Sequence, residues 1–471
     1  MIANSIIRSN RLAALVLLTL GTTACPAEDT EEPADAGPAA VADAGPTSTT
    51  IADIASSDAN FSTLLAVVQK ADLVSVLAGD GPLTVFAPTN DAFAASGLDQ
   101  AALDALSATD AAQIITYHAV AGTVLSSSLS AGVVNTVAEL SLVVGTEGGV
   151  TLNGGNTVTG GANVTTADVT ADNGVVHVID RVLLPPTVAD LTRYAGLTEL
   201  GAAVEAAGLV ETLSGEGPFT VFAPTNDAFP DDTAGLNVAQ VLTYHVLSGS
   251  VASDAVTSGN VDTLATQSFG EGDAATNVSL DLFIDTSAGV RLNDTANVVI
   301  ADVRATNGIV HVIDGVLVPL NIAQVATVAG FSQLVAAASA SAPIPAALAG
   351  GDNDVPVVDA LSTLSALTVF APNDDAFGTA FPGGLPSDQA AILGVLGGHV
   401  IAGTAPVLAA GLPADTNAEV GALVGGLTFD ASANPPTVSL VGGNSAGIVA
   451  TDIGATNGVV HVIDTVLVGN P

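Results

Sequence analysis

Two sequence boxes occur three times in the same order, and this repetition constrains the fold of the chain most strongly. The first box, TVFAPTNDAF or TVFAPNDDAF, begins at Thr84, Thr220 and Thr368. The second box, NGVVHVID or NGIVHVID, begins at Asn173, Asn307 and Asn457. The first threonine precedes the second-box histidine by 93, 91 and 93 residues. Preserved order and spacing indicate three copies of one domain.

The chain has 471 residues, which suits three units of about 150 residues each. The boxes place the three copies at residues 49–186, 187–321 and 322–470. Residues 26–48 are rich in Ala, Pro, Asp and Gly and lack hydrophobic periodicity. Such a composition cannot bury a core, so we expect a disordered tether there.

Each copy begins with a helical pattern and ends with a strand pattern. Phe61, Leu64, Leu65 and Val68 have the spacing of an amphipathic helix, with Asp58 or Asn60 as its N-cap. Pro88 ends a short strand, and Thr89 or Asn90 can cap a helix beginning near Asp91. Asn173-Gly174 predicts a tight turn before a buried last strand. The fold class is therefore α+β.

These boxes, with a Tyr-His motif between them at Tyr117-His118 and Tyr244-His245, resemble the fasciclin family of domains. Copy 3 departs from the pattern, because Gly398 precedes His399. The resemblance implies a wedge-shaped β-sandwich or barrel decorated by helices in each copy. It also implies a non-enzymatic extracellular protein that works in adhesion or matrix contact by binding partners.

The N-terminus has the order of a bacterial lipoprotein signal. Arg8 and Arg11 precede the apolar run Leu12–Leu20, and Thr22-Thr23-Ala24 leads to the sole cysteine, Cys25. The run is shorter than the ~20 residues that span a bilayer. We expect residues 1–25 to be a signal whose Cys25 is acylated and anchors the chain to the cell envelope. An ordinary secretory signal is the alternative, because Thr22 stands where a lipobox usually has Leu.

Charge excludes one class of partner. The chain carries 47 acidic and 7 basic residues, a net charge of −40. Such a surface repels phosphate backbones and anionic lipids, so nucleic-acid binding is excluded. We expect membrane contact only through the lipid anchor, and a monomeric or weakly self-associating chain. The partner is expected to be a protein or a surface polymer, of unknown identity.

Six histidines fall two to a copy, always in the same motifs. They are His118, His177, His245, His311, His399 and His461. A regular pair suggests metal ligation or acid–base catalysis. However, each lies among apolar residues at helical or strand spacing, where a neutral imidazole can donate to a buried carbonyl. We therefore predict structural histidines, with no catalytic residue, metal or cofactor. By family resemblance, Tyr117, His118, Tyr244 and His245 are candidate partner-binding residues.

Two shorter motifs match functional patterns without the required context. Gly443-Asn444-Ser445-Ala446-Gly447 fits the hydrolase pattern G-x-S-x-G, but it falls between two predicted strands and not at a strand-to-helix elbow. Asp352-Asn353-Asp354 starts like a calcium loop, but the glycine and glutamate that such a loop needs are missing. We predict a turn at the first and no calcium loop at the second.

The sequence thus predicts a surface-anchored adhesion or matrix-contact lipoprotein. Two alternatives stay open: a passive envelope spacer, and an extracytoplasmic protein that binds a small ligand.

Overall fold

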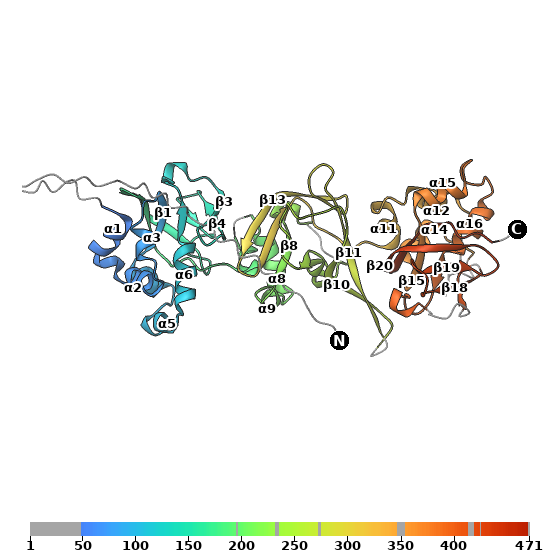
Figure 1. The fold of residues 1–471 in the computed structure, drawn as a ribbon, viewed down its shortest axis with the longest axis horizontal. Coiled ribbons are helices and arrows are strands. Elements are labelled where there is room, and N and C mark those ends of the chain that lie inside the picture. The colour runs from blue at the N-terminus through green and yellow to red at the C-terminus, as the bar shows by residue number, and fades with distance from the viewer. Residues whose placement is uncertain are drawn as a thin grey trace, which may run out of the picture. The chain divides into compact units, whose positions relative to one another are not determined.

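The computed structural model describes residues 49–194, 196–230, 235–271, 275–345, 354–412, 419–423 and 425–469. The signal, Cys25 and the tether predicted for residues 1–48 lie outside the described residues, as do Asp352 and Asn353. Each of the three sequence copies has its own sheet and its own helices (Figure 1). The α+β fold class is confirmed.

Domain 1 places most of its helices before and between its first two strands. Its helices are α1 (Ile51–Ser57), η1 (Ala59–Phe61), α2 (Ser62–Lys70), α3 (Val74–Leu77), α4 (Asn90–Ala95), α5 (Gln100–Ala105), α6 (Ala108–Tyr117) and η2 (Ser126–Ser128). Its strands are β1 (Leu83–Pro88), β2 (Ala119–Ala121), β3 (Gly132–Asn135), β4 (Ser141–Gly145), β5 (Thr151–Leu152), β6 (Ala162–Ala171) and β7 (Gly174–Ile179).

Domain 2 repeats this order with fewer helices. Its helices are α7 (Val188–Leu191), α8 (Thr198–Ala206), α9 (Val210–Leu213), η3 (Asn226–Ala228) and α10 (Val238–Tyr244). Its strands are β8 (Phe219–Pro224), β9 (Val246–Ser248), β10 (Gly259–Phe269), β11 (Thr276–Asp285), β12 (Arg291–Leu292), β13 (Ala296–Ala305) and β14 (Gly308–Ile313).

Domain 3 follows the same plan. Its helices are α11 (Ile322–Val328), α12 (Ser332–Ala340), α14 (Val357–Thr363), α15 (Asp374–Ala380), α16 (Gln389–Gly397) and η5 (Ala409–Gly411). Its strands are β15 (Leu367–Pro372), β16 (Val400–Ala402), β17 (Glu419–Gly421), β18 (Gly426–Asp430), β19 (Thr437–Leu440), β20 (Ser445–Ala455) and β21 (Gly458–Ile463).

The three seven-stranded sheets share one topology. The strand order in domain 1 is β2-β1-β7-β6-β5-β4-β3. Domains 2 and 3 have the equivalent orders β9-β8-β14-β13-β12-β11-β10 and β16-β15-β21-β20-β19-β18-β17. In domain 1, β1 and β7 pair in parallel, and the other described neighbours are antiparallel. The parallel pair joins the first repeated box to the second.

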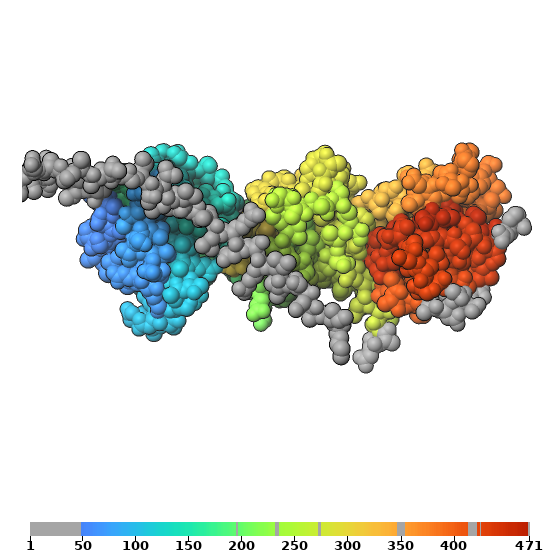
Figure 2. All heavy atoms as spheres, in the orientation of Figure 1, coloured from blue at the N-terminus to red at the C-terminus, as the bar shows by residue number. Residues whose placement is uncertain are grey.

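Alternation along the central strands divides each core into two clusters. Val85 and Ala87 of β1 pack with helix residues such as Leu64, while Phe86 between them packs with Leu142 across the sheet. Successive strand residues point to opposite faces, so one strand serves both clusters. In Figure 2 the blue-to-cyan, green-to-yellow and orange-to-red atoms each gather in their own part of the molecule. All described residues belong to one compact unit.

The helix expected after the first box forms in domains 1 and 3 but is reduced to a short 3-10 turn in domain 2. Thr89 caps α4 and Asn373 caps α15, each accepting a hydrogen bond from a backbone N–H of the first turn. In domain 2 a single 3-10 turn, η3, ends at Ala228. Pro230 explains this difference, because proline disfavours helical backbone at the preceding Phe229, whose ψ is 134°.

The Asn-Gly turn before the last strand is confirmed in each copy, and the asparagine does more than turn the chain. Asn173 Oδ1 accepts from the Ile51 N–H at 2.9 Å, and its Nδ2 donates to the carbonyls of Leu77 and Gly79. Asn307 and Asn457 make the equivalent bonds. The second box therefore also fastens the start of each domain to its last strand.

Candidate functional site

The two repeated boxes form neighbouring parallel strands, which sets the position of the second-box histidine. Leu83–Pro88 pair residue by residue with Gly174–Ile179. Phe86 lies beside His177, and their rings stack with centroids 5.4 Å apart. The equivalent pairs, Phe222–His311 and Phe370–His461, stack at 5.7 and 5.3 Å. Each domain therefore buries this histidine against the phenylalanine of the first box.

Both ring nitrogens of the second-box histidine are in use. His177 Nε2 donates to the Val124 carbonyl at 2.9 Å, and its Nδ1 accepts from the Asp168 N–H at 3.2 Å. Because a carbonyl only accepts and an amide N–H only donates, the ring is the neutral Nε2–H tautomer. His311 and His461 make the same two bonds. No ring nitrogen is left to ligate a metal.

Both ring nitrogens of the middle-motif histidine also have hydrogen-bond partners. His118 Nδ1 donates to the Ile114 carbonyl at 2.8 Å, and its Nε2 accepts from the Leu183 N–H at 3.0 Å. It thus joins α6 to the segment after the last strand. Burial lowers the pKa of His118 to about 4, against the smaller opposing effect of the Ile114 carbonyl. His245 and His399 repeat the bonds and the lowered pKa.

The tyrosine beside this histidine belongs to a buried polar network. Tyr117 Oη donates to the Ser141 carbonyl at 2.9 Å and accepts from Asn153 Nδ2 at 2.9 Å. Tyr244, Asp281 and Asn293 form the same arrangement in domain 2. In domain 3, where Gly398 replaces the tyrosine, Phe370 and Phe429 pack at 5.6 Å in the equivalent cluster. Leu440 lies beside Gly398, since a Cβ on this glycine would be 3.4 Å from Leu440 Cδ1.

The residues singled out in the sequence thus come together inside each domain and not on its surface. Tyr117 and His118 are 0% and 1% exposed, and Tyr244 and His245 are 0% and 2% exposed. All four side chains are thus almost fully inside the fold, although His245 also lines a pocket together with Leu242 and Val316. Within the described ranges, no group of three or more His, Cys, Asp or Glu residues could hold a metal ion.

Of the G-x-S-x-G sequence, Gly443 and Asn444 lie between β19 and β20 as predicted, whereas Ser445, Ala446 and Gly447 are the first residues of β20. Ser445 is the first residue of β20, and its hydroxyl lies 2.6 Å from that of Ser439 in β19. Asn444 Nδ2 donates to the Val466 carbonyl, and its Oδ1 accepts from the Val468 N–H. The segment is a strand connection tied to the end of domain 3.

One recurring aspartate was missed by sequence reasoning. Asp168, Asp302 and Asp452 have φ values of 59°, 60° and 60° and lie at irregularities of the long strands β6, β13 and β20. Asp168 Oδ1 accepts from the Ser126 N–H, and hydrogen bonds from Ser126 lower the pKa of this carboxyl. The available signal was the repeated Asp nine residues before each second-box histidine.

A short hydrogen bond joins domains 2 and 3. The Gly454 N–H of β20 donates to Asp281 Oδ2 of β11 at 2.6 Å, and Asn260 Nδ2 donates to Asp281 Oδ1 at 2.6 Å. Burial raises the pKa of Asp281 to about 6 although both hydrogen bonds act to lower it. Domains 1 and 2 meet in the same way, since the Arg304 N–H of β13 donates to Ser141 Oγ of β4 at 2.8 Å.

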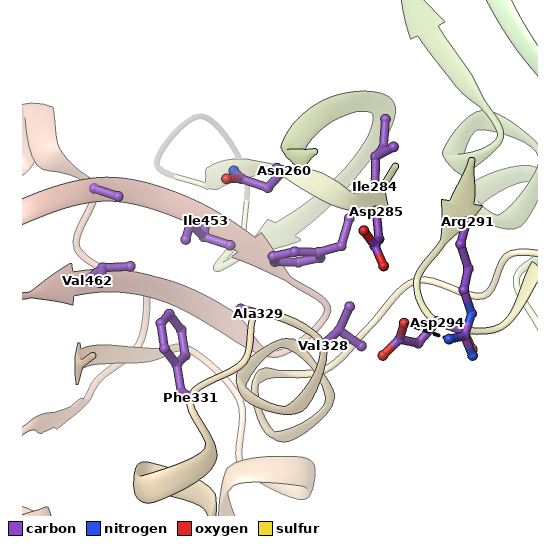
Figure 3. Close-up of a pocket in the computed structure, with 13 residues that line it drawn as sticks. Asn260, Ile284, Asp285, Arg291, Asp294, Val328, Ala329, Phe331, Ile453 and Val462 are labelled. Carbon is purple, nitrogen blue, oxygen red and sulfur yellow. Dashed lines mark hydrogen bonds and ion pairs between the residues drawn. The ribbon is translucent and has the colours of Figure 1, made fainter. Parts of the chain in front are cut away.

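A pocket of about 330 Å³ lies beside the joint between domains 2 and 3 (Figure 3). Phe331, Val328, Ile453 and Val462 give it apolar walls, and the charged side chains lie at one end. Arg291 and Asp294 form an ion pair there, Nη1 to Oδ1, at 3.3 Å. Asp285, also at this end, accepts hydrogen bonds from the N–H and hydroxyl of Ser287, so each of these charged groups has a partner in the chain.

The comparisons with known proteins agree with this architecture. The sequence model of the Fasciclin domain matches residues 59–185, 195–319 and 352–469. The chain belongs to the fasciclin family. Protein sll1483 of Synechocystis is 42% identical over 139 residues, 29% of this chain and 74% of that protein. Transforming growth factor-beta-induced protein ig-h3 of Sus scrofa is 28% identical over 424 residues, 86% of this chain.

This fasciclin chain spans only part of the larger animal relatives. It covers 56% of ig-h3, and it matches human periostin at 29% identity over 45% of this chain and 26% of that protein. A FAS1 domain pair from the insect cell adhesion molecule Fasciclin I is similar at 21% identity and a TM-score of 0.35. That match covers 55% of this chain and 97% of the insect structure. Among the described helices, none is long and apolar enough to cross a bilayer.

Proposed function

We propose that this fasciclin protein is a surface-anchored adhesion or matrix-contact lipoprotein that binds a protein or a surface polymer without catalysis. The presence of three complete fasciclin domains carries the proposal, because ig-h3 aligns with 86% of the chain across all of them. The bonded state of all six histidines supports a binding role over an enzymatic one. The histidines, which are the residues most suited to acid–base chemistry, instead join secondary-structure elements within each domain.

Three similar domains in tandem favour multivalent attachment. Weak contacts made by separate domains combine when the geometry allows them to engage together. The polar bonds from Ser141 and Asp281 to the next domain limit relative movement and so help such contacts act at once. The acidic surface favours a basic partner or one bridged by cations. Binding to such a partner should weaken as ionic strength rises.

Anchoring through Cys25 completes the proposal. An acylated Cys25 followed by the tether of residues 26–48 would hold the domains away from the envelope membrane. Labelling cells with a clickable fatty acid tests this directly. Label should appear in the full chain and be absent from Cys25→Ser. Equal labelling of both chains would exclude acylation at Cys25.

The decisive experiment compares attachment by cells that lack the gene with attachment by cells complemented by the full chain. Adhesion predicts that deletion reduces attachment and biofilm formation and that complementation restores them. A passive spacer predicts normal attachment after deletion. A pull-down of surface material with the soluble three-domain fragment, with and without calcium, then identifies the partner class. Loss of attachment without a saturable partner would contradict direct binding.

A further inference from the structure

Domain 2 has a groove of about 410 Å³ between α8 and α10, apart from the pocket of Figure 3. Ala203 of α8 lines one side, Val238 of α10 lines the other, and Val316 after β14 completes the wall. The described lining is apolar except for Glu199 and His245. All of these residues belong to domain 2, so the groove is a feature of this domain alone.

One wall position is buried in the other two domains. Val316 corresponds to Val182 and Val466, because each precedes the residue whose N–H donates to the middle-motif histidine. Val182 and Val466 are each 1% exposed. Val316 is only partly buried. Domain 2 therefore leaves open a position that its two sister domains cover.

Two further wall positions show the same difference. Val238 lies seven residues before the middle-motif histidine, where the other domains have Ala111 and Ile392. Val238 is 36% exposed, whereas Ala111 and Ile392 are 0% and 4% exposed. The first-box phenylalanine of domain 2, Phe229, is only partly buried, and its counterparts in domains 1 and 3 are 2% and 3% exposed. The three exposed positions together mark one missing cover.

In domain 1 the cover is a helix. Residues 94–106 connect the first box to the cap of the next helix and include α5, whereas residues 230–236 make this connection in domain 2. Leu103 of α5 belongs to the same apolar cluster as Val182. Lys70 Nζ donates to the Leu103 carbonyl at 2.7 Å and so holds α5 against α2. The shorter connection of domain 2 explains why the equivalent space is a groove.

The groove has room for a helix from outside the chain. Ala203 and Ala206 stand where domain 1 has Val67 and Lys70, counted from the first box. These smaller side chains lower the surface of α8 and let another helix approach it closely. An amphipathic helix that lays its apolar face into an apolar groove is a recurring mode of peptide recognition.

Charge selects which helix can bind. Glu199 lines the groove, and Glu205 and Asp227 are exposed on α8 and η3. The described elements α8, α9, η3 and α10 contain no Lys or Arg. Ala206 also removes the one cation that holds the acidic helix α5 in domain 1. Complementary charge therefore favours a partner helix whose polar face carries Lys and Arg.

We propose that the groove between α8 and α10 of domain 2 binds a basic amphipathic helix of a partner protein, whose apolar face covers Val238 and Val316. The inference rests on the proposed binding function, because it names the chemistry of one partner. The two can fail separately, since helix binding is measured in solution and attachment is measured on cells.

The probe is a labelled synthetic helix of leucine and lysine, about four turns long, with every leucine on one face. In fluorescence anisotropy the full chain should bind it saturably, at one equivalent. A peptide of the same composition with its leucines spread around the helix should bind about tenfold more weakly, because it keeps the charge and loses the apolar face. A leucine and glutamate helix should not bind.

Two valines of domain 2 provide a matched test of location. Val238 and Val318 are 36% and 46% exposed, and only Val238 belongs to the lining. Val238→Asn should weaken probe binding about tenfold, because the surface that the leucines bury becomes polar. Val318→Asn should leave the affinity unchanged. Absence of saturable binding, equal binding of the spread-leucine peptide, or equal loss in both variants would overturn the proposal.

Restoring the cover is the second test. A chain in which residues 94–106 replace residues 230–236, combined with Ala206→Lys, regains the sequence of α5 and the lysine that holds it. This chain should lose probe binding, and retained binding would contradict the proposal. If the grafted chain does not fold, the comparison of Val238→Asn with Val318→Asn still decides. Nile red binding that Val238→Asn weakens, without any helix binding, would assign the groove to a small ligand and overturn the proposal.

Discussion

The backbone N–H of Gly454 donates a hydrogen bond of 2.6 Å to Oδ2 of Asp281, and this bond joins domain 3 to domain 2. Asp281 and Ser141 hold equivalent positions, since the carbonyl of each accepts from the buried tyrosine of its own domain. Their side chains accept from equivalent positions in the next domain, Gly454 and Arg304. The long strand of one domain thus contacts the preceding domain by a repeated device.

Gly454 is required where the two strands approach each other. A Cβ at this position would overlap the Ser279 carbonyl oxygen and also crowd Val278 Cγ1 at 2.9 Å. Gly454→Ala should therefore separate the domains and remove the Asp281 bond, at a cost of about 1–3 kcal/mol. In calorimetry, domain 3 of the variant should melt at a lower temperature than in the native chain, and its transition should be less coupled to that of domain 2. Gly378→Ala is the control, because its added methyl has no neighbour within 4 Å; equal effects would rule out the steric argument.

Asp281 should make the joint stronger in mild acid. Its pKa in the folded chain is raised to about 6 from 3.8. The stability that this shift contributes is therefore complete below pH 3.8 and is lost as pH rises through 6. Asn260 faces this carboxyl, and Asp262 and Asp452 add negative charge that raises its pKa. The shift corresponds to about 3 kcal/mol. The FRET distance between dyes on domains 2 and 3 should narrow in distribution from pH 8 to pH 5.

Asp281→Asn is the comparison for this prediction. The amide oxygen can still accept from Gly454, and the side chain no longer ionises. The variant should show the narrow distance distribution at both pH values and greater stability than the native chain at pH 8. Persistence of the pH dependence in Asp281→Asn would assign it to another group.

Much of each domain could be predicted because its signals are local. Gly and Asn in the second box fix the turn before β7, and Thr89 caps α4 as its position after Pro88 indicates. The apolar neighbours of His177 on its strand predicted a buried ring with a hydrogen-bonding role. Its partners, Val124 and Asp168, could not be predicted, because only the chain path after β2 brings them close.

The joints were not predicted because their residues look ordinary in the sequence. Ser141 and Asp281 occupy the same place but differ in type, and Arg304 and Gly454 act through the backbone, which carries no sequence signature. Interfaces between domains depend on surface fit, which three-dimensional placement alone reveals.

Domain 1 should lose stability in acid through His118. Its folded pKa of about 4 lies below the ordinary 6.5, so the unfolded chain takes up a proton first as pH falls. Stability is therefore constant above pH 6.5, decreases between 6.5 and 4, and then levels off. The loss reaches about 3 kcal/mol, opposite in sign to the effect of Asp281. Urea unfolding followed by a probe in domain 1 should show this decrease from pH 7.5 to 4.5, and a flat profile would contradict the neutral buried imidazole.

Removing the hydroxyl of Tyr117 should have the opposite consequence to removing that of Tyr194. Tyr117→Phe leaves Asn153 Nδ2 and the Ser141 carbonyl without their 2.9 Å partner inside the core. Stability should fall by about 1–3 kcal/mol because these groups stay buried. Tyr194→Phe removes a hydroxyl that has no hydrogen-bond partner, so it should cause no loss of stability. Thermal unfolding of both variants tests the contrast directly. Equal effects of the two substitutions would mean that the hydrogen bonds of Tyr117 do not contribute to stability.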